Sequence, residues 1–354
     1  MTSRLSVAFR VDESAQTGRG HMSRCSALAG ALQDAGAQVS FYCQDVSTDT
    51  KSALQSRGIC VVELLDEGAF LDRDWSGEIV VVDGYQFGED FWQRLLAAHP
   101  RRTVFIDDFR RVRYVADLLI CCNDGLEVTQ FNLAPATRLL LGGRYLLLRP
   151  EILQAARSAS LPTPRRAVML AVGGTRQEQW VINILTHLSI VDPRATLWVL
   201  SGRPLPVGKV LRRVGLSPGR VRFFSGLEPD EMLRLYRRAR YLVAPASTVM
   251  LEAFTVGCPI ISGWIADNQR NSLDFYHRQG LVLNMGDLRR IRLSCLVRAR
   301  SSLRLKGHSM MRSQRSYIAA SRTGIIEIVK AVLSINDGVE HSIQPTFPDQ
   351  SATD

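Results

Sequence analysis

Short apolar runs alternate with longer helical patterns along the first 150 residues. The runs are rich in β-branched side chains and predict strands, whereas the Ala- and Leu-rich segment 22–35 predicts a helix. Continuous apolar runs are typical of parallel strands that are covered on both faces, so the alternation predicts a doubly wound α/β domain. Its strands are expected at 5–9, 39–43, 79–82, 104–106 and 118–121.

The same alternation restarts after residue 165, with strands expected at 167–172, 196–201, 221–224, 241–244 and 259–261. Serine and proline residues between the two halves indicate a linker. Two Rossmann-like domains of this kind, an α/β fold, are expected to bind a ligand in the cleft between them. The predicted organisation is a first domain 1–150, a linker 151–165, a second domain 166–333 and a flexible polar tail 334–354.

The amino-acid composition indicates which class of protein the chain belongs to. The chain is 46% hydrophobic and 22% charged, which is typical of a soluble globular protein. No segment reaches the roughly 20 apolar residues of a membrane helix, and no basic and apolar leader precedes the first strand. The seven cysteines have no metal-ligand spacing and are expected to be buried thiols. We therefore expect a cytoplasmic protein without an integral membrane segment.

The formal net charge of +10 comes mostly from arginine clusters. These clusters lack interleaved aromatic residues and any groove-reading motif, so a nucleic-acid partner is not expected. Solvated helix faces, an anionic phosphorylated substrate or a loosely held surface partner account for the charge more simply. The oligomeric state is left open by the sequence.

A glycine-rich loop, G-R-G-H, connects the first strand to the first helix. Ligands of open α/β sheets bind at the carboxyl ends of strands, glycines allow close approach, and a helix start favours anions and a neutral imidazole. We predict that His21 is a general base, and that Arg10, Asp12, Gly18 and Gly20 contact the substrate. The alternative is that His21 packs or caps the helix. The loop matches neither a dinucleotide fingerprint nor a phosphate loop.

Acidic and aromatic residues follow two further strands of the first domain. Asp83 and Tyr85 come after one strand, and Asp107 and Asp108 after the next. Carboxylates at these strand ends can orient an imidazole or bind substrate hydroxyls, or they can cap helices. No third or fourth ligand occurs at a sensible spacing, so a metal is not expected.

Glycines and hydroxyl residues follow strands of the second half. Two glycines and a threonine after the strand 167–172 predict a phosphate cradle, and a Ser-Thr pair opens a later helix. Glu252, one turn further on, could hold both hydroxyls of a ribose. The predicted nucleotide-binding residues are Gly173, Gly174, Thr175, Ser247, Thr248 and Glu252.

Two stretches carry a family resemblance. The run from Phe9 to Ala29, F-R-V-D-E-S-A-Q-T-G-R-G-H-M-S-R-C-S-A-L-A, resembles the opening motif of the UDP-sugar hydrolases of pseudaminic acid biosynthesis. The run A-S-T-V-M-L-E-A-F-T-V-G-C-P-I, followed by D-N-Q, resembles their UDP-binding half. The second stretch is also similar to GT-B glycosyltransferases related to the lipid II-forming enzyme of peptidoglycan synthesis. The resemblance covers about residues 5–283 and implies a GT-B fold.

The resemblance implies an inverting hydrolase that needs neither metal nor cofactor. It would release UDP from UDP-2,4-diacetamido-2,4,6-trideoxy-β-L-altrose or a related UDP-sugar by attack of water on the anomeric carbon. His21 falls on the catalytic histidine of the family, and Tyr85 and Asn268 fall on residues that line the same site. Arg149 falls on an arginine of the substrate cleft, and Gln269 belongs to the same D-N-Q group.

Two alternatives remain open. In a GT-B glycosyltransferase, His21 would deprotonate an acceptor hydroxyl instead of water. A transferase with a lipid-linked acceptor should also expose an apolar patch on its first domain. The third hypothesis is a non-catalytic protein that binds nucleotide sugars, because the loop Thr175-Arg176-Gln177 and the glycine-free Ala244-Pro245-Ala246 depart from the family pattern.

Overall fold

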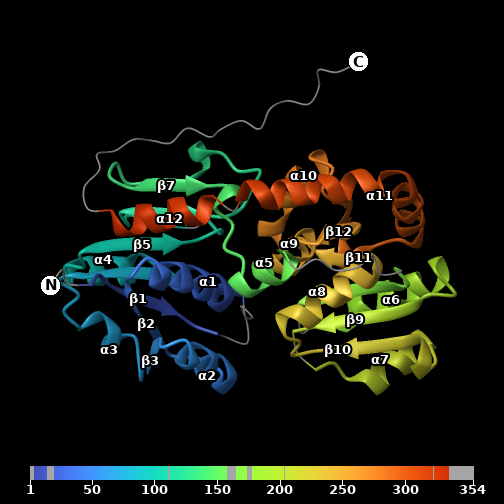
Figure 1. Ribbon diagram of the computed structural model, residues 1–354, viewed down its shortest axis with the longest axis horizontal. Helices are drawn as coiled ribbons and strands as arrows, with labels where there is room; N and C mark the ends of the chain where they lie inside the picture. Colours follow the sequence, from blue (N-terminus) through green and yellow to red (C-terminus); the bar gives the residue numbers. More distant parts are fainter. Residues whose placement is uncertain are drawn as a thin grey trace, which may run out of the picture.

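The computed structural model describes residues 4–13, 20–110, 112–157, 165–173, 178–202, 204–321 and 323–334. Three predicted site residues, Gly18, Gly174 and Thr175, lie outside these ranges. So do residues 158–164 of the predicted linker and 335–354 of the predicted tail. The described residues form two parallel β-sheets flanked by helices (Figure 1).

The first sheet has seven strands in the order β3-β2-β1-β4-β5-β6-β7, and all neighbours are parallel. The chain moves outward from β1 in one direction and then continues on its other side, which is the predicted doubly wound topology. The strands are β1 Ser6–Val11, β2 Gln38–Cys43, β3 Cys60–Glu63, β4 Glu78–Asp83, β5 Arg102–Ile106, β6 Leu118–Cys121 and β7 Arg138–Leu141. The helical elements are α1 Gly20–Asp34, α2 Thr48–Ser56, α3 Gly68–Leu71, α4 Glu89–Ala97, η1 Val128–Gln130 and η2 Gly143–Tyr145.

The second sheet has six parallel strands in the order β10-β9-β8-β11-β12-β13. Its strands are β8 Ala167–Gly173, β9 Thr196–Ser201, β10 Val221–Phe224, β11 Ala239–Pro245, β12 Ile260–Trp264 and β13 Leu283–Asp287. The helical elements from residue 150 onward are α5 Pro150–Arg157, α6 Glu178–Val191, α7 Val207–Val214, η3 Pro218–Arg220, α8 Pro229–Arg238, α9 Thr248–Phe254, η4 Asp267–Gln269, α10 Arg270–Arg278, η5 Leu288–Arg290, α11 Leu293–Ser321 and α12 Gly324–Leu333.

Each sheet is buried on both faces. Successive side chains of a strand point to opposite faces, and here they enter different apolar cores. In β1, Val7 belongs to one core and Ala8 to another, and in β8 Val168 and Met169 are divided in the same way. This arrangement confirms the expectation that continuous apolar runs form parallel strands covered on both sides.

All ten strands that the apolar runs predict are present. Those at 118–121, 196–201 and 221–224 have the predicted bounds, and the others differ at their ends by at most three residues. Three strands, β3, β7 and β13, were not predicted, and each lies at the edge of its sheet.

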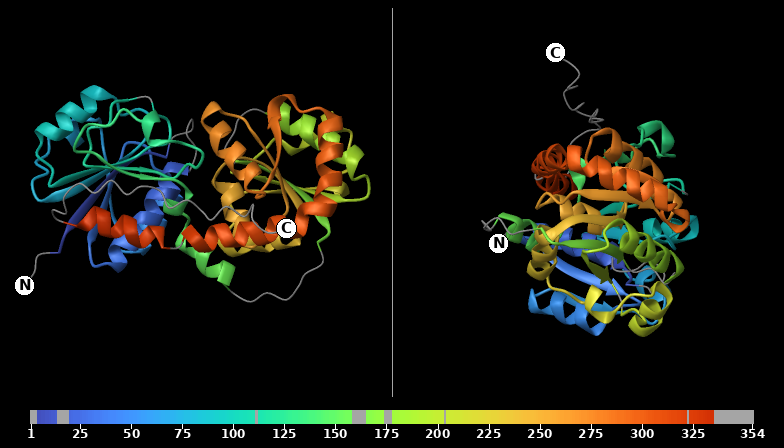
Figure 2. Two further views of the ribbon diagram at one scale, coloured as in Figure 1. Left: turned by 90° about the horizontal axis from the view of Figure 1, so that it is seen from above. Right: turned by 90° about the vertical axis from the view of Figure 1, so that its right-hand side faces the viewer.

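The domain boundaries need two corrections. The range 166–333, predicted as the second domain, includes α12, but Ile328 and Val332 of this helix lie in a core of the first domain, beside α1. Figures 1 and 2 show α12 crossing back to the first sheet. The predicted linker 151–165 contains most of α5, whose Ile152 lies in a core of the second domain. The apolar stripe of an amphipathic helix can pack against any complementary apolar surface. Its sequence therefore does not tell which of the two domains the helix joins.

The carboxyl ends of the two sheets point toward each other (Figure 1). In such sheets ligands bind outside these strand ends, so the fold places two potential binding edges face to face. Within the described part of the chain, no helix has the length and apolar character needed to cross a membrane.

Candidate active site

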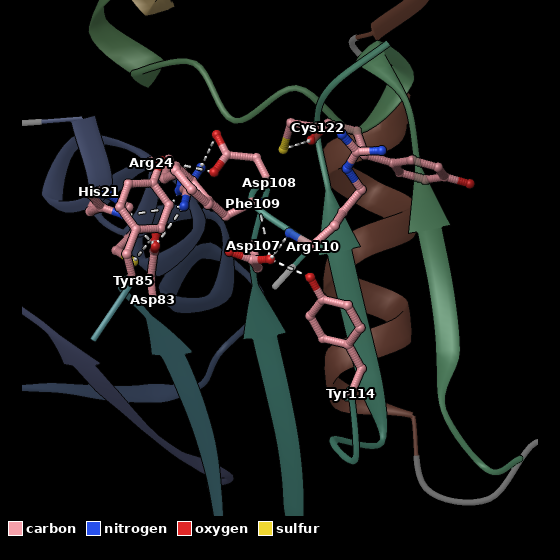
Figure 3. Close-up of polar contacts among 12 residues, drawn as sticks. His21, Arg24, Asp83, Tyr85, Asp107, Asp108, Phe109, Arg110, Tyr114 and Cys122 are labelled. Atoms are coloured by element: carbon pink, nitrogen blue, oxygen red, sulfur yellow. Dashed lines mark hydrogen bonds and ion pairs between the residues drawn. The ribbon is translucent and has the colours of Figure 1, made fainter. Parts of the chain in front are cut away.

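The carboxyl edge of the first sheet gathers side chains from three adjacent strands. β1, β4 and β5 are neighbours, and the segments that follow them carry His21, Tyr85 and Asp108. α1 begins at Gly20, so His21 stands in the first turn of this helix and is 5% exposed. Figure 3 shows His21, Tyr85 and Asp108 close together, with Arg24 and Asp83 among them.

Asp83, the last residue of β4, is fully buried and holds this group together. Its carboxylate lies 2.5 Å from Nδ1 of His21 and receives two hydrogen bonds of 2.6 Å from Nε and Nη2 of Arg24. The Cys25 thiol donates a fourth contact at 3.3 Å. Burial opposes ionisation of the carboxyl, but Arg24 and then His21 outweigh it and hold the pKa of Asp83 well below its ordinary value.

The charge on Asp83 determines the tautomer of His21. An ionised carboxylate only accepts hydrogen bonds, so Nδ1 of His21 must carry a proton to donate to it. In the neutral imidazole, Nε2 then keeps the lone pair and is the nitrogen that can accept a proton. From its place in the sequence Asp83 could orient an imidazole, bind a substrate hydroxyl or cap a helix, and the geometry fits the orienting position.

Tyr85 and Asp108 form the outer part of the site. The ring of Tyr85 meets that of His21 edge-on with centroids 4.5 Å apart, and its hydroxyl donates to Asp108 at 2.8 Å. Nη1 of Arg24 lies 3.5 Å from the same carboxylate. Burial and the Asp108 charge raise the pKa of Tyr85 well above its ordinary value, so this hydroxyl stays protonated. Phe109 packs on the other side, with its ring centroid 4.6 Å from that of Tyr85.

Asp107, the neighbour of Asp108 in the chain, stabilises the turn after β5 and does not contact His21. Its carboxylate accepts the backbone N–H groups of Phe109 and Arg110 at 3.1 and 3.0 Å and a hydrogen bond from the Tyr114 hydroxyl. Arg110 has a φ of +58°, a conformation that side chains other than glycine adopt rarely. The Asp107 carboxylate therefore fixes the strained turn that presents Asp108 and Phe109.

Arg10 does not fit the substrate contact that the sequence suggested. The side chain is fully buried, and its guanidinium makes hydrogen bonds to Glu67, Asp12, Gln44 and the backbone carbonyl of Tyr42. These five contacts match the five N–H donors of arginine, which leaves none for a ligand. Burial makes the charge costly, and the acids paired with it compensate for that cost.

Asp12 is also used by the protein itself. Besides Arg10, its carboxylate accepts the backbone N–H of Gln44 at 2.7 Å and the side-chain amide of Gln86 at 3.0 Å. It thereby joins the loops that follow β1, β2 and β4. The structure gives Arg10 and Asp12 a role in fixing this edge. Arg10 has no donor left for its predicted substrate contact, whereas a contact between Asp12 and a substrate stays a prediction.

The predicted residues of the second domain follow β8, β11 and β12 at the carboxyl edge of that sheet. Gly173 ends β8 with a φ of +61°, where a side chain would be strained. Ser247 precedes α9 and its side chain does not cap the helix, whereas Thr248 is the first helical residue. Asn268 and Gln269 lie in η4 after β12, and Gln269 accepts the backbone N–H of Ile265 at 2.9 Å.

Arg149 and Glu252, predicted to bind different parts of the substrate, contact each other. Nε and Nη2 of Arg149 lie 3.1 and 3.0 Å from the same oxygen of Glu252, which is 3% exposed. Burial raises the pKa of Glu252, and Arg149 opposes this effect. Arg149 thus provides the counter-charge of the buried carboxylate, and a contact between Glu252 and a ribose stays a prediction.

The structure therefore brings His21, Asp83, Tyr85 and Asp108 into one cluster, and Arg149 and Glu252 into a second. Arg24 and Phe109 belong to the first cluster as well, although no role was predicted for them from the sequence. The position of Arg24 could have been predicted, because residues three apart on a helix lie on the same face. Arg24 follows His21 at that spacing. Among the described residues, no group of three or more His, Cys, Asp or Glu side chains could hold a metal ion.

The chain matches no protein-family model and no curated protein sequence. Many solved structures are similar in fold, and three of them illustrate the likeness. The Anabaena HepE protein, solved in complex with UDP-glucose, aligns at 13% identity with a TM-score of 0.64 over 93% of this chain and 98% of that chain. A putative UDP-N-acetylglucosamine 2-epimerase from Listeria monocytogenes aligns at 11% identity with a TM-score of 0.62 over 93% and 96%. MurG from Acinetobacter baumannii aligns at 12% identity with a TM-score of 0.58 over 93% and 99%. These likenesses confirm the predicted GT-B fold, with two Rossmann-like domains.

Proposed function

We propose that this chain is an enzyme that hydrolyses a nucleotide-activated sugar, a UDP-sugar, to UDP and the free sugar. One observation carries the proposal: Nδ1 of His21 lies against the buried, ionised Asp83, which makes Nε2 the basic nitrogen of the neutral imidazole, at a sheet edge that faces the second domain. The resemblance of the loop around His21 to UDP-sugar hydrolases supports it. So does the fold shared with a protein that was solved with UDP-glucose.

In the proposed reaction, Nε2 of His21 takes a proton from a water molecule while the water oxygen bonds to the anomeric carbon. The bond between this carbon and the diphosphate oxygen breaks, and UDP leaves with the electron pair and with inversion at the carbon. Asp83 accepts the Nδ1 hydrogen bond and stabilises the imidazolium that forms. General-base catalysis of this type contributes about 10²- to 10⁴-fold to the rate.

The second domain would hold the UDP. Gly173 and the start of α9 at Ser247 and Thr248 offer backbone amides and hydroxyls at the carboxyl edge of the sheet, and such groups suit a diphosphate. Asn268 and Gln269 follow the neighbouring strand β12 at the same edge. The half-exposed ring of Tyr85 would contact the sugar beside His21, and the family resemblance suggests a 2,4-diacetamido-2,4,6-trideoxy sugar.

The test is to incubate the protein with a panel of UDP-sugars in ¹⁸O-labelled water without an acceptor. We expect UDP and free sugar, with ¹⁸O on the sugar and none on the UDP. His21→Ala should abolish release, whereas His308→Ala, which changes an exposed histidine of α11, should not. Absence of release from every UDP-sugar, or ¹⁸O in the UDP, would contradict the proposal.

The same geometry could deprotonate an acceptor hydroxyl, so a second arm adds sugar and lipid-linked acceptors. If UDP release requires an acceptor and yields a glycoside, the protein is a transferase with the same base. If it binds a UDP-sugar and releases nothing under either condition, it is a binding protein.

A further inference from the structure

The long helix α11 has an unusual charge pattern. Its 29 residues include six Arg or Lys side chains and no Asp or Glu. It runs along the outside of the second domain (Figure 2). Like charges over eight helical turns repel one another unless carboxylates of the protein or external anions compensate them, so this face requires an explanation.

Internal partners account for only part of this charge. Arg300 lies 3.3 Å from Asp192, and Arg315 donates to the backbone carbonyl of Val256 at 3.3 Å. Arg304, Lys306 and Arg312 are exposed, and no carboxylate of the described residues lies within ion-pair distance of them. These three cations are therefore available to an external ligand.

An apolar side chain stands in the middle of these cations. Leu305 is 87% exposed, and its neighbours along the chain are Arg304 and Lys306. Arg298 and Arg312 lie seven residues before and after it, a spacing that returns to nearly the same side of a helix. Leu303 and Met310, on the opposite side of α11, are buried in the core of the second domain.

We propose that this α11 patch, consisting of Arg298, Arg304, Leu305, Lys306 and Arg312, docks on an anionic lipid surface. The cations would contact acidic headgroups, while Leu305 would enter the boundary with the acyl chains. Clusters of Lys and Arg on a helix are attracted to anionic lipid, and apolar side chains beside them can enter the boundary between headgroups and acyl chains. The proposal is independent of the proposed function, because the patch shares no residue with the candidate active site.

The apolar side chain favours lipid over nucleic acid. A nucleic acid offers phosphates to the cations but no apolar layer to Leu305, and it gains from aromatic side chains on which bases stack. The only aromatic ring of α11 apart from His308 is Tyr317, and it is buried. Substitution of Leu305 therefore distinguishes experimentally between a lipid surface and a nucleic acid as the partner.

The experiment is flotation of the full chain with vesicles made of two parts phosphatidylcholine and one part phosphatidylglycerol. We expect binding at low salt, loss at high salt and no binding to pure phosphatidylcholine. The double substitution Arg304→Glu/Lys306→Glu should lower the partition coefficient by about tenfold or more. The matched control, Arg4→Glu/Arg101→Glu, makes the same change in net charge on exposed first-domain residues and should alter binding less than about twofold.

Leu305→Gln tests the apolar contact and should weaken vesicle binding several-fold. Leu65→Gln, which changes a first-domain leucine that is 98% exposed, should have no effect. Circular dichroism checks that all variants fold. Equal losses from both double substitutions, or failure to bind anionic vesicles, would overturn the proposal. So would tight binding of a single-stranded RNA that depends on Arg304 and Lys306 but not on Leu305.

Discussion

At the scale of single residues, the buried carboxylate of Asp83 is shared by two cationic or potentially cationic groups. Arg24 contacts both of its oxygens at 2.6 Å, while His21 contacts one. Because the guanidinium already compensates the negative charge, the imidazole does not have to be protonated for the carboxylate to remain buried and ionised. Arg24 therefore acts on the proposed chemistry through His21, as a positioning residue.

Replacing Arg24 should move the pH dependence of the reaction. In Arg24→Gln the carboxylate of Asp83 loses its permanent partner, and among the described residues the protonated imidazole becomes the only cation in direct contact with it. We expect the acidic limb of the pH profile of kcat/KM to shift upward by about one pH unit or more. Arg24→Lys keeps the charge and should shift the limb less. A lower rate with an unchanged limb would mean that Arg24 only supports the local structure.

Asp83→Asn should reduce kcat by about 10²- to 10⁴-fold. The amide N–H of asparagine can donate to Nδ1, which would stabilise the wrong tautomer of His21, and the neutral amide cannot stabilise the imidazolium. KM should change much less, since the side chain is buried and away from solvent. Steady-state kinetics on the preferred UDP-sugar measure both values. An equal loss for Cys25→Ala, which removes another contact of the same carboxylate, would show that the site tolerates no change of packing at all.

The depressed pKa of Asp83 also predicts how stability depends on pH. A carboxyl group with a lowered pKa in the folded state stabilises the protein above its unfolded pKa of about 3.9, and this contribution is lost as pH falls. The difference in free energy of unfolding between the wild type and Asp83→Asn should therefore stay constant from neutral pH down to about pH 5 and shrink as the pH falls further below about 4. Urea unfolding at several pH values measures it. A difference that stays constant with pH would argue against the ionised pair.

At the scale of elements, the sequence predicts central strands far better than edge strands. Central strands such as β4 are covered on both faces and read as continuous apolar runs. The edge strands β3, C-V-V-E, and β13, L-N-M-G-D, have a neighbour on one side only and are partly exposed, so polar residues interrupt them. β7, R-L-L-L, was missed because an apolar run of that length does not distinguish a strand from a helix.

The site was predictable to the extent that it depends on strand ends. Adjacent parallel strands end at one edge, which is enough to place Asp83, Tyr85 and Asp108 near His21. Whether a polar residue is free depends on its partners in three dimensions. Arg10 follows the same strand-end pattern, yet its partner Glu67 is 57 residues away in the sequence, and only the fold shows that its donors are used.

Two isoleucines of α12 allow a test of whether this helix belongs to the first domain. Ile328 is fully buried in the first domain, whereas Ile326 on the same helix is 56% exposed. Ile328→Ala should lower the free energy of unfolding by about 2–5 kcal/mol, because it leaves a cavity in that core. Ile326→Ala should change it by less than about 1 kcal/mol. Hydrogen exchange should rise in α1 for the first variant, and a rise confined to the second domain would contradict the assignment.

At the scale of the whole molecule, the two domains are joined by a buried polar contact as well as by α12. Asp124, which follows β6 of the first domain, accepts the Tyr317 hydroxyl of α11 at 2.5 Å, and its backbone carbonyl accepts the Ser272 hydroxyl of α10 at 3.2 Å. The carboxylate also accepts the backbone N–H of Gly143 at 2.8 Å, and a side chain at Gly143 would collide with Tyr317. Burial raises the pKa of Asp124, and Tyr317 opposes this effect. The contact therefore links β6 and η2 of the first domain to α10 and α11 of the second.

Tyr317→Phe should loosen this contact between domains. The variant keeps the ring but removes the donor, so a buried carboxylate loses a hydrogen bond, at a cost of about 1–3 kcal/mol. Tyr241→Phe is the matched control, because Tyr241 donates to Asp192 at 2.7 Å within the second domain. Both variants should lose similar stability, but only Tyr317→Phe should raise hydrogen exchange on both sides of the boundary, around Asp124 and in α10. If the two edges must stay in register for His21 to reach a sugar held by the second domain, only Tyr317→Phe should also raise KM. Equal kinetics for the two variants would show that this contact stabilises the fold without setting the geometry of the site.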